Sequence, residues 1–365
     1  MKSERNHALD IIRIVSAIGI VMLHYQQSLV GGGMRFGGVT VDAENGPFQF
    51  RFFVQVFFVL SGYLSLRYAE RIREGLSFPE FFKKRVIRIV PLLAVTVLVY
   101  VIFQFLYISM GGYLETDPYV PNLWGTITAM LGVARLWCFE GAGIMEPTWF
   151  LCGLLLCYAI MYFLVFYAGR KKISELYLFG LMVMIGCSLL IVGTEIPFLT
   201  ISGGRAYSAF FFGLLFAAYR KRREPKALHY LCAAVILLIV TGSALIAPDF
   251  IAFGQIHIVT FLVSPACILL AESPAAKKIF AWKGFGEAGA WTYSVFLWHK
   301  PLILILLCLL TANGLSMDFS QPVVFFAFLL LLFVISAVSY HLIELPVTRL
   351  AEKRHDRGSS NADAL

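Results

Sequence analysis

The chain has 365 residues, a net charge of +8 and a mean hydropathy of +0.79, and only 14% of its residues are charged. Ordinary soluble domains carry about 25% charged residues, so the composition excludes that class and predicts a protein that crosses a membrane many times. The basic residues stand in short clusters between apolar runs, which indicates topology signals instead of a nucleic-acid surface. The seven cysteines show no metal-ligand spacing, and we expect free thiols and no metal site.

Apolar runs of about 20 residues can cross a bilayer as helices. The chain is therefore predicted to be an all-α polytopic bundle of about ten transmembrane helices. The predicted spans are 9–27, 48–66, 89–109, 149–168, 175–193, 204–219, 228–247, 254–271, 291–312 and 322–342. An apolar piece at 123–138 is too short to span comfortably and predicts a re-entrant or interfacial helix. We expect one membrane domain over 1–346 and a polar, disordered cytoplasmic tail over 347–365.

The positions of Lys and Arg predict the orientation. When both termini are placed in the cytoplasm, 24 of the 30 Lys and Arg residues fall in cytoplasmic segments, as the positive-inside rule requires. The largest cluster lies at 67–88, between the second and third spans. No small-residue cleavage site follows the first span, so we expect it to stay as a signal anchor. These observations predict a multi-pass protein of the cell membrane.

The first predicted span holds three ionisable residues, Asp10, Arg13 and His24. Charged groups inside a membrane are costly and usually face the bundle interior or a water-filled cavity. The spacing of Arg13 and His24 places them on one helix face, about 16 Å apart along the axis. Asp10 precedes Arg13 by three residues, which is the spacing of a helical ion pair. The alternative is a snorkelling arginine and a histidine satisfied in the core.

Two further motifs predict either cavity groups or simple packing. The sequence FFVLSGYL at 57–64 predicts a close helix contact through Ser-Gly, or a cavity lined by Ser61 and Tyr63. Arg85 and Arg88 lie three residues apart, on one helix face at the entrance to the third span. Two guanidinium groups on one face suit an oxyanion such as phosphate, although a topology anchor has the same pattern.

Other ionisable residues lie in the ninth span and in the connection before the fourth. His299 and Lys300 stand mid-span, where a lysine is costly and should reach a partner or water. The alternative is that Pro301 only kinks this helix. Glu140 and Glu146 lie in the outer connection. They could be acid–base partners, but their position favours solvated loop acids.

Together and in this order, these motifs resemble those of the acyltransferase family 3 membrane proteins, which O-acylate sugars and cell-wall polymers. The resemblance covers almost the whole chain. It rests on the first span with Asp10, Arg13 and His24, FFVLSGYL at 57–64, Arg85-x-x-Arg88-Ile-x-Pro91, Pro147-Thr-Trp149-Phe-Leu151, Tyr293-Ser294 with His299-x-Pro301, and Glu344-x-Pro346.

The resemblance implies a ten-helix bundle that takes an acyl group from cytoplasmic acyl-CoA, with acetyl-CoA as the expected donor. The acceptor would be a hydroxyl of a carbohydrate or cell-envelope polymer at or beyond the membrane, and no bound cofactor is expected. The candidate site residues are, as the catalytic group, His24, Arg13 and Asp10; as donor-binding cations, Arg85, Arg88 and Arg67; and around the substrate cavity, Ser61, Tyr63, Trp149, His299 and Lys300.

The chain departs from the family pattern in one place. Many members have a Trp-Ser-Leu segment followed by glutamates, whereas residues 149–155 here read Trp-Phe-Leu-Cys-Gly-Leu-Leu. This is closer to a sub-group with Trp-Phe-Leu, which often acts on extracellular polysaccharides or lipid-linked sugars. The expected acid is missing, so the carboxylate partner of His24 stays open. No fused esterase-like domain is expected.

The alternative function is a transporter that moves a sugar, polymer or acyl group without covalent chemistry. Its intramembrane His, Lys and Arg would then form a proton or substrate path. The two functions differ in whether the thioester of acyl-CoA is consumed in the presence of an acceptor.

Overall fold

The computed structural model describes residues 5–114, 120–134, 136, 137, 144–246 and 254–350. Arg135, Cys138, Glu140 and most of the predicted tail lie outside these residues. In the described part, ten helical segments are long and apolar enough to cross a membrane, which confirms the predicted spans. They are His7–Val30, Phe50–Arg73, Phe78–Ser109, Thr148–Lys171, Glu175–Val192, Ile201–Arg222, Ala227–Ile246, Gly254–Ala271, Lys283–Ala312 and Pro322–Leu350. The chain is a multi-pass, all-helical membrane protein.

The bounds of the elements follow in chain order. They are α1 (His7–Tyr25), the π-helix η1 (Gln26–Val30), β1 (Met34–Phe36), β2 (Val39–Val41), the 3-10 helix η2 (Phe50–Phe52), α2 (Phe53–Arg73), α3 (Phe78–Ser109), α4 (Leu123–Met130), α5 (Thr148–Lys171), α6 (Glu175–Val192), β3 (Glu195–Ile196), β4 (Leu199–Thr200), α7 (Ile201–Arg222), α8 (Ala227–Ile246), the π-helix η3 (Val259–Val263), α10 (Ser264–Ala271), α11 (Pro274–Ile279), α12 (Lys283–Ala312), α13 (Pro322–Ser339) and the π-helix η4 (Tyr340–Glu344). Each pair of short strands forms an antiparallel hairpin on a loop between spans.

The third span begins well before its predicted start at 89. Ser77 caps α3 with its side chain, so the helix begins at Phe78 and Pro91 lies inside it. A proline within a membrane helix is tolerated because neighbouring groups satisfy the freed backbone carbonyl. The longer helix matters for the site, because Arg85 and Arg88 stand on α3 itself.

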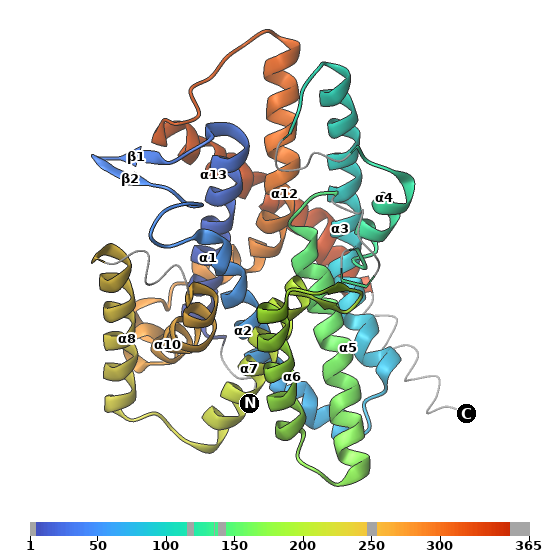
Figure 1. Cartoon of the computed structure of the whole chain (residues 1–365), viewed down its shortest axis with the longest axis vertical. Coiled ribbons are helices and arrows are strands. Elements are labelled where there is room, and N and C mark those ends of the chain that lie inside the picture. The colour runs from blue at the N-terminus through green and yellow to red at the C-terminus, as the bar shows by residue number, and fades with distance from the viewer. Residues whose placement is uncertain (1–4, 115–119, 135, 138–143, 247–253, 351–365) are drawn as a thin grey trace.

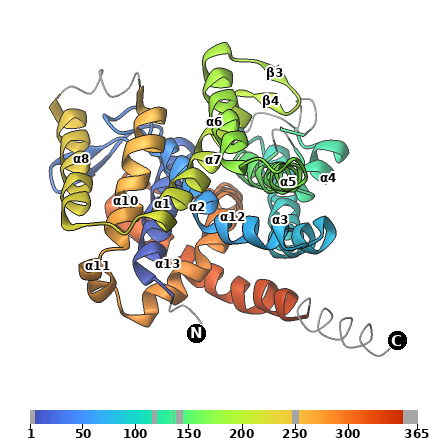
Figure 2. The same ribbon diagram turned by 90° about the horizontal axis from the view of Figure 1, so that it is seen from below.

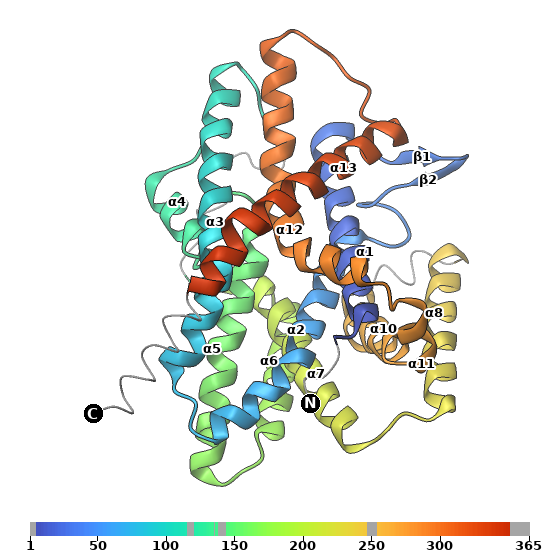
Figure 3. The same cartoon turned by 180° about the vertical axis from the view of Figure 1, so that it is seen from behind.

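Helix α1 lies inside the bundle, where it packs against α2 and α12 (Figure 1). Helix α2 in turn packs along α7, and α7 packs along α6. Helices α8 and α10 stand to one side of the other helices (Figure 2). Helix α13 crosses α12 obliquely on the face of the molecule seen in Figure 3. The face of α1 between Arg13 and His24 is enclosed, since Ala17 and Ile20 are at most 1% exposed. The bundle therefore turns this face inward, as the sequence predicted.

Helices α2 and α7 approach closely at a pair of glycines. A Cβ added at Gly62 would overlap the carbonyl oxygen of Phe210, and one added at Gly213 would overlap that of Val59. Backbone atoms cannot move aside as the end of a flexible side chain can, so the contact requires glycine at both positions. The Ser-Gly pair of FFVLSGYL thus serves as a helix contact through Gly62.

We expect Gly62→Ala to destabilise the protein by about 1–3 kcal/mol, the usual range for overpacking a tight contact. Gly180 on α6 is the matched control, because a Cβ there meets open space and alanine favours the helix by about 1 kcal/mol. The measurement is the melting temperature of both purified variants in detergent. Equal melting temperatures would contradict a backbone contact at Gly62.

Ion pairs join the loops that the positive-inside rule assigns to the cytoplasm. Nη1 of Arg73, at the end of α2, lies 3.3 Å from Oε1 of Glu175, at the start of α6. Arg220 near the end of α7 lies 2.7 Å from Glu272, which follows α10. These loops therefore lie at one end of the bundle. That this end faces the cytoplasm stays a prediction.

Cysteine labelling of intact cells tests this orientation. The described cysteines are free thiols, and Cys232 is exposed, so the test uses a Cys232→Ser background. An impermeant maleimide is expected to label Tyr113→Cys and to leave Glu74→Cys unlabelled until the membrane is opened. Both positions are exposed, and they lie just beyond the two ends of α3. Labelling of Glu74→Cys alone would invert the orientation.

Candidate functional site

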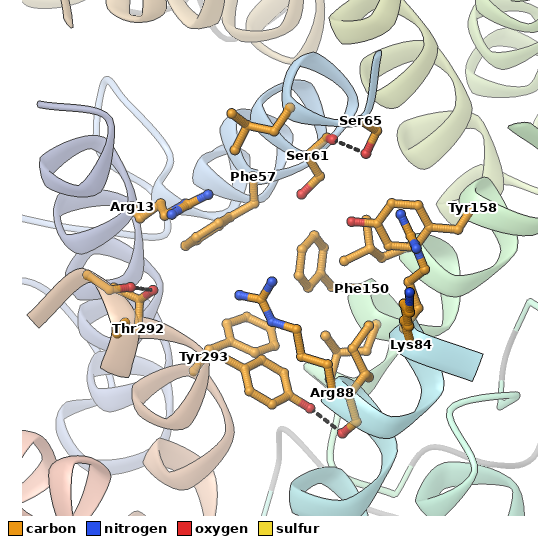
Figure 4. A pocket seen from close by; sticks show the side chains of 18 of the residues that line it. Arg13, Phe57, Ser61, Ser65, Lys84, Arg88, Phe150, Tyr158, Thr292 and Tyr293 are labelled. Carbon is orange, nitrogen blue, oxygen red and sulfur yellow. Dashed lines mark hydrogen bonds between the residues drawn. The ribbon is translucent and has the colours of Figure 1, made fainter. Parts of the chain in front are cut away.

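A cavity of about 250 Å³ lies between α1, α2, α3, α5 and α12 (Figure 4). Five cationic side chains line it, and none of its lining residues in the described part of the chain carries a carboxylate. The five cations are Arg13, Arg67, Lys84, Arg85 and Arg88. We call this space the cationic cavity. Such a concentration of positive charge favours a polyanionic ligand, because guanidinium and ammonium groups bind phosphate and carboxylate oxygens.

Arg13 reaches the cationic cavity from α1, and Asp10 holds it there. Its Nη1 donates to Asp10 Oδ1 at 2.9 Å, which confirms the predicted ion pair. Arg5 donates to the same carboxylate through Nε and Nη2, at 2.8 and 3.0 Å. Asp10 is 1% exposed, and a side chain at Gly289 of α12 would collide with it. Two arginines thus donate hydrogen bonds to this buried carboxylate, which lies where it can orient the Arg13 side chain.

Arg85 and Arg88 both line the cavity but are held differently. The Arg85 guanidinium carbon lies 3.8 Å from the ring centroid of Phe81 and 3.9 Å from that of Tyr68, and its Nη1 donates to Phe81 O at 2.8 Å. Arg88 extends its guanidinium into the cavity, as Arg13 does from the opposite wall (Figure 4). Arg88 therefore points into the cavity, whereas aromatic rings brace Arg85.

Helix α2 contributes Ser61 to the cavity, while Tyr63 points elsewhere. Ser65, one turn further along, lines the same wall and donates to Ser61 O at 2.6 Å. The Tyr63 hydroxyl instead donates to the Glu272 carboxylate, and its ring packs against Phe216. Of the two residues predicted from FFVLSGYL, the structure places only Ser61 in the cationic cavity.

Three phenylalanines from three helices meet at one side of the cavity. The ring centroids of Phe57, Phe150 and Phe296 lie between 5.3 and 6.4 Å apart, and all three rings line the cavity. Phe296 also packs against His299, with ring centroids 5.9 Å apart. We call these three residues the phenylalanine cluster, and its member Phe296 contacts both the cationic cavity and His299.

His24 and His299 stack on each other beyond the phenylalanine cluster. Their ring centroids are 5.2 Å apart and their planes are inclined by 25°. His24 is 6% exposed and His299 is fully buried. His299 Nδ1 lies 2.7 Å from Phe296 O, so in the neutral ring we assign the proton to Nδ1, and Nε2 remains an acceptor. Lys300 is buried beside the pair and interacts electrostatically with both rings.

Glu146, just before α5, lies close to this histidine pair. Its Oε2 is 3.7 Å from His24 Nδ1. Its side chain is 36% exposed, so Glu146 is both partly solvated, as expected of a loop acid, and close to His24. Arg205 of α7 also interacts electrostatically with Glu146, and its guanidinium lies over the ring of Trp149 at 4.7 Å. Trp149, predicted near the substrate, thus belongs to the surroundings of His24 and lies outside the cationic cavity.

Three features of this arrangement have no clear signal in the sequence. The phenylalanine cluster belongs to the motifs described above, but nothing in one helix indicates that Phe57, Phe150 and Phe296 meet. Arg5 lies before the first span and carries no intramembrane signal. Glu146 was considered, but its distance to His24 depends on how separate helices pack.

The fold and the site define a multi-pass membrane protein that can hold a polyanion near one end of α1 and has buried histidines near the other. The family model for the acyltransferase domain matches residues 6–341, and the chain belongs to acyltransferase family 3. YrhL of Bacillus subtilis (strain 168), whose name provisionally describes it as a peptidoglycan O-acetyltransferase, is 22% identical over 386 aligned residues. The alignment covers 93% of this chain but 54% of YrhL, so the chain spans about half the length of this curated relative. No solved structure matches this chain.

Proposed function

We propose that this protein is an O-acyltransferase of the cell membrane that takes an acyl group, in the first place acetyl, from cytoplasmic acyl-CoA. The acceptor is a hydroxyl of an extracytoplasmic or lipid-linked carbohydrate or of a cell-envelope polymer. Membership of acyltransferase family 3 supports the reaction class, and the name of the Bacillus relative supports a cell-envelope acceptor. The observation that carries the proposal is the order of groups along α1 and α12: cations, then phenylalanines, then histidines.

This order matches the chemistry of acyl-CoA. The donor has a polyanionic nucleotide end, a long uncharged pantetheine arm and a reactive thioester at the far end. The cationic cavity suits the phosphates, the phenylalanine cluster suits the uncharged arm, and the histidines suit the thioester. Arg13 then serves the phosphate end, because it lies about 16 Å from His24 along the helix axis.

Acyl transfer requires a base for the acceptor hydroxyl, and neutral histidine suits that task near pH 7. His24 accepts the hydroxyl proton while the acceptor oxygen attacks the thioester carbonyl carbon. The new C–O bond forms and the C–S bond breaks, and the CoA thiolate leaves with the proton that His24 returns. The buried surroundings of His24 exclude water, which would otherwise hydrolyse the thioester.

The phenylalanine cluster lies across the route from the cations to His24. For the thioester to reach the histidine, these rings must turn aside. Rotation of aromatic side chains at a helix interface needs no change in the fold.

The experiment that tests the proposed function uses the purified protein in detergent with labelled acetyl-CoA and a carbohydrate acceptor. We expect loss of thioester and an equal gain of label in the acceptor. Uptake of an unmodified sugar or polymer into proteoliposomes, with acetyl-CoA unconsumed, would favour the transporter.

A further inference from the structure

The protein lacks a carboxylate in the segment where many family members have one, yet a carboxylate lies beside His24. Residues 152–155 of α5 are Cys-Gly-Leu-Leu, whereas Glu146 Oε2 lies 3.7 Å from His24 Nδ1. No hydrogen bond forms at His24 Nδ1 in the described part of the chain, although this atom is buried. Hydrogen bonds in catalytic sites are often long without substrate and tighten when it binds. A buried ring nitrogen facing a carboxylate is the arrangement that fixes a histidine tautomer.

The turn that carries Glu146 is held firmly in place. Ile144 and Met145 are 2% and 1% exposed, and Thr148 is fully buried. Met145 adopts φ of 53°, a left-handed conformation that costs a residue with a side chain about 1–2 kcal/mol. The Thr148 and Trp149 amides donate to Met145 O and Glu146 O, at 3.0 and 3.3 Å. Packing therefore maintains a strained backbone whose effect is to direct Glu146 toward His24, and such strain is typical of functional sites.

We propose that Glu146 is the positioning residue for His24, an inference that rests on the proposed function. Its carboxylate keeps the proton on Nδ1, which leaves Nε2 as the base for the acceptor hydroxyl, and it balances the positive charge that His24 gains during transfer. The turn before α5 thus supplies the carboxylate that is missing after Trp149.

The other groups around His24 do not take this part. His299 covers one ring face, and its own Nδ1 is engaged by Phe296 O. Lys300 interacts electrostatically with His24, and Gln27, which also interacts with it, is a neutral side chain. Arg205 of α7 interacts electrostatically with Glu146. Among the contacts of His24 in the described part of the chain, Glu146 thus supplies the carboxylate.

The test compares Glu146→Gln, which removes the charge but keeps the shape, with Glu146→Asp, which keeps the charge on a shorter side chain. We expect Gln to lower kcat about 10- to 100-fold, less than the roughly 10⁴-fold loss for a fully buried, directly bonded triad aspartate. Asp should fall between Gln and the wild type. The KM for acetyl-CoA should stay within about twofold, because the cationic cavity lies at the other end of α1. If Glu146 had only a structural role, its substitution would lower the melting temperature and would not lower kcat selectively at an unchanged KM.

Glu44→Gln is the matched control. Glu44 lies in the loop after β2 and accepts a hydrogen bond from Gln27 at 2.9 Å. We expect this variant to keep the wild-type kcat. A kcat for Glu146→Gln within twofold of the wild type, or a loss confined to KM, would overturn the proposal.

Arg205→Gln decides whether Glu146 acts through His24 or only balances Arg205. If Glu146 only balanced the charge of Arg205, the double variant Glu146→Gln, Arg205→Gln would be nearly as active as Arg205→Gln alone. We expect no recovery, because His24 still lacks its carboxylate. Recovery would overturn the proposal. The proposed function fails separately, when the wild type and Glu44→Gln also transfer no acyl group.

Discussion

Both His24→Ala and His24→Gln are expected to lower acyl transfer by about 10²–10⁴-fold, the usual cost of losing a general base. Glutamine can keep a hydrogen bond in place of the ring but cannot accept a proton at neutral pH. His24 lies between the His299 ring and the Glu146 carboxylate, so its substitution removes the base and leaves the cationic cavity unchanged. The KM for acetyl-CoA should therefore change little while kcat collapses. Initial rates of thioester loss over a range of acetyl-CoA concentrations measure both quantities.

The matched control for His24 is His257→Gln, in the eighth span. His257 stacks on Phe261 with ring centroids 6.2 Å apart, which is a packing role for a half-buried histidine. We expect both glutamine variants to insert and to melt near the wild-type temperature, and only His24→Gln to lose activity. Retention of more than about a tenth of wild-type turnover by His24→Gln would make His24 an orienting group. His299 would then be the next candidate for the base.

Replacing Arg88 with alanine should raise the KM for acetyl-CoA about 10- to 100-fold with a much smaller change in kcat. Hydrogen bonds between charged groups contribute about 1.5–3 kcal/mol each, and Arg88 points into the cationic cavity (Figure 4). Arg85→Ala should differ, because Arg85 is braced by Phe81 and Tyr68. We expect it to lower the melting temperature as well as donor affinity. The double variant should combine both effects.

Arg73→Ala is the control for this series. Arg73 belongs to the same basic segment, but it pairs with Glu175 and does not line the cavity. Its loss should leave the KM for acetyl-CoA unchanged. If a folded Arg85→Ala, Arg88→Ala double variant kept the wild-type KM, the two arginines would serve as a topology anchor only.

The sequence identified the ionisable groups but not how they are divided between two places. Arg13, Arg67, Arg85 and Arg88 converge on the cationic cavity, while His24, His299 and Lys300 meet about 16 Å further along α1. Periodicity within one helix placed Arg13 and His24 on a shared face, because the rotation per residue is fixed. It could not indicate that α12 presents His299 to that face, since the packing of separate helices leaves no periodic signal in the chain.

The FFVLSGYL motif and Glu146 also show that the sequence does not indicate which side chains of separate helices meet. The motif allowed either a helix contact or a cavity wall, and both occur, because Gly62 faces α7 while Ser61 faces the cationic cavity. Glu146 was interpreted as a solvated acid, since its neighbours in sequence indicate a loop. Its contact with His24 depends on how the separate helices pack and on the buried turn at 144–148, which includes a left-handed residue.

The sequence by itself determined the ten spans, because the hydrocarbon core of a membrane requires long apolar helices and shows them directly as composition. It also determined the ion pair of Asp10 and Arg13, which depends on one turn of one helix. Only the tertiary structure decided the cationic cavity, the phenylalanine cluster, the stacked histidines and the carboxylate beside them. Each of these joins side chains from different helices, and their meeting depends on close packing such as that of Gly62 against α7 and Gly289 against α1.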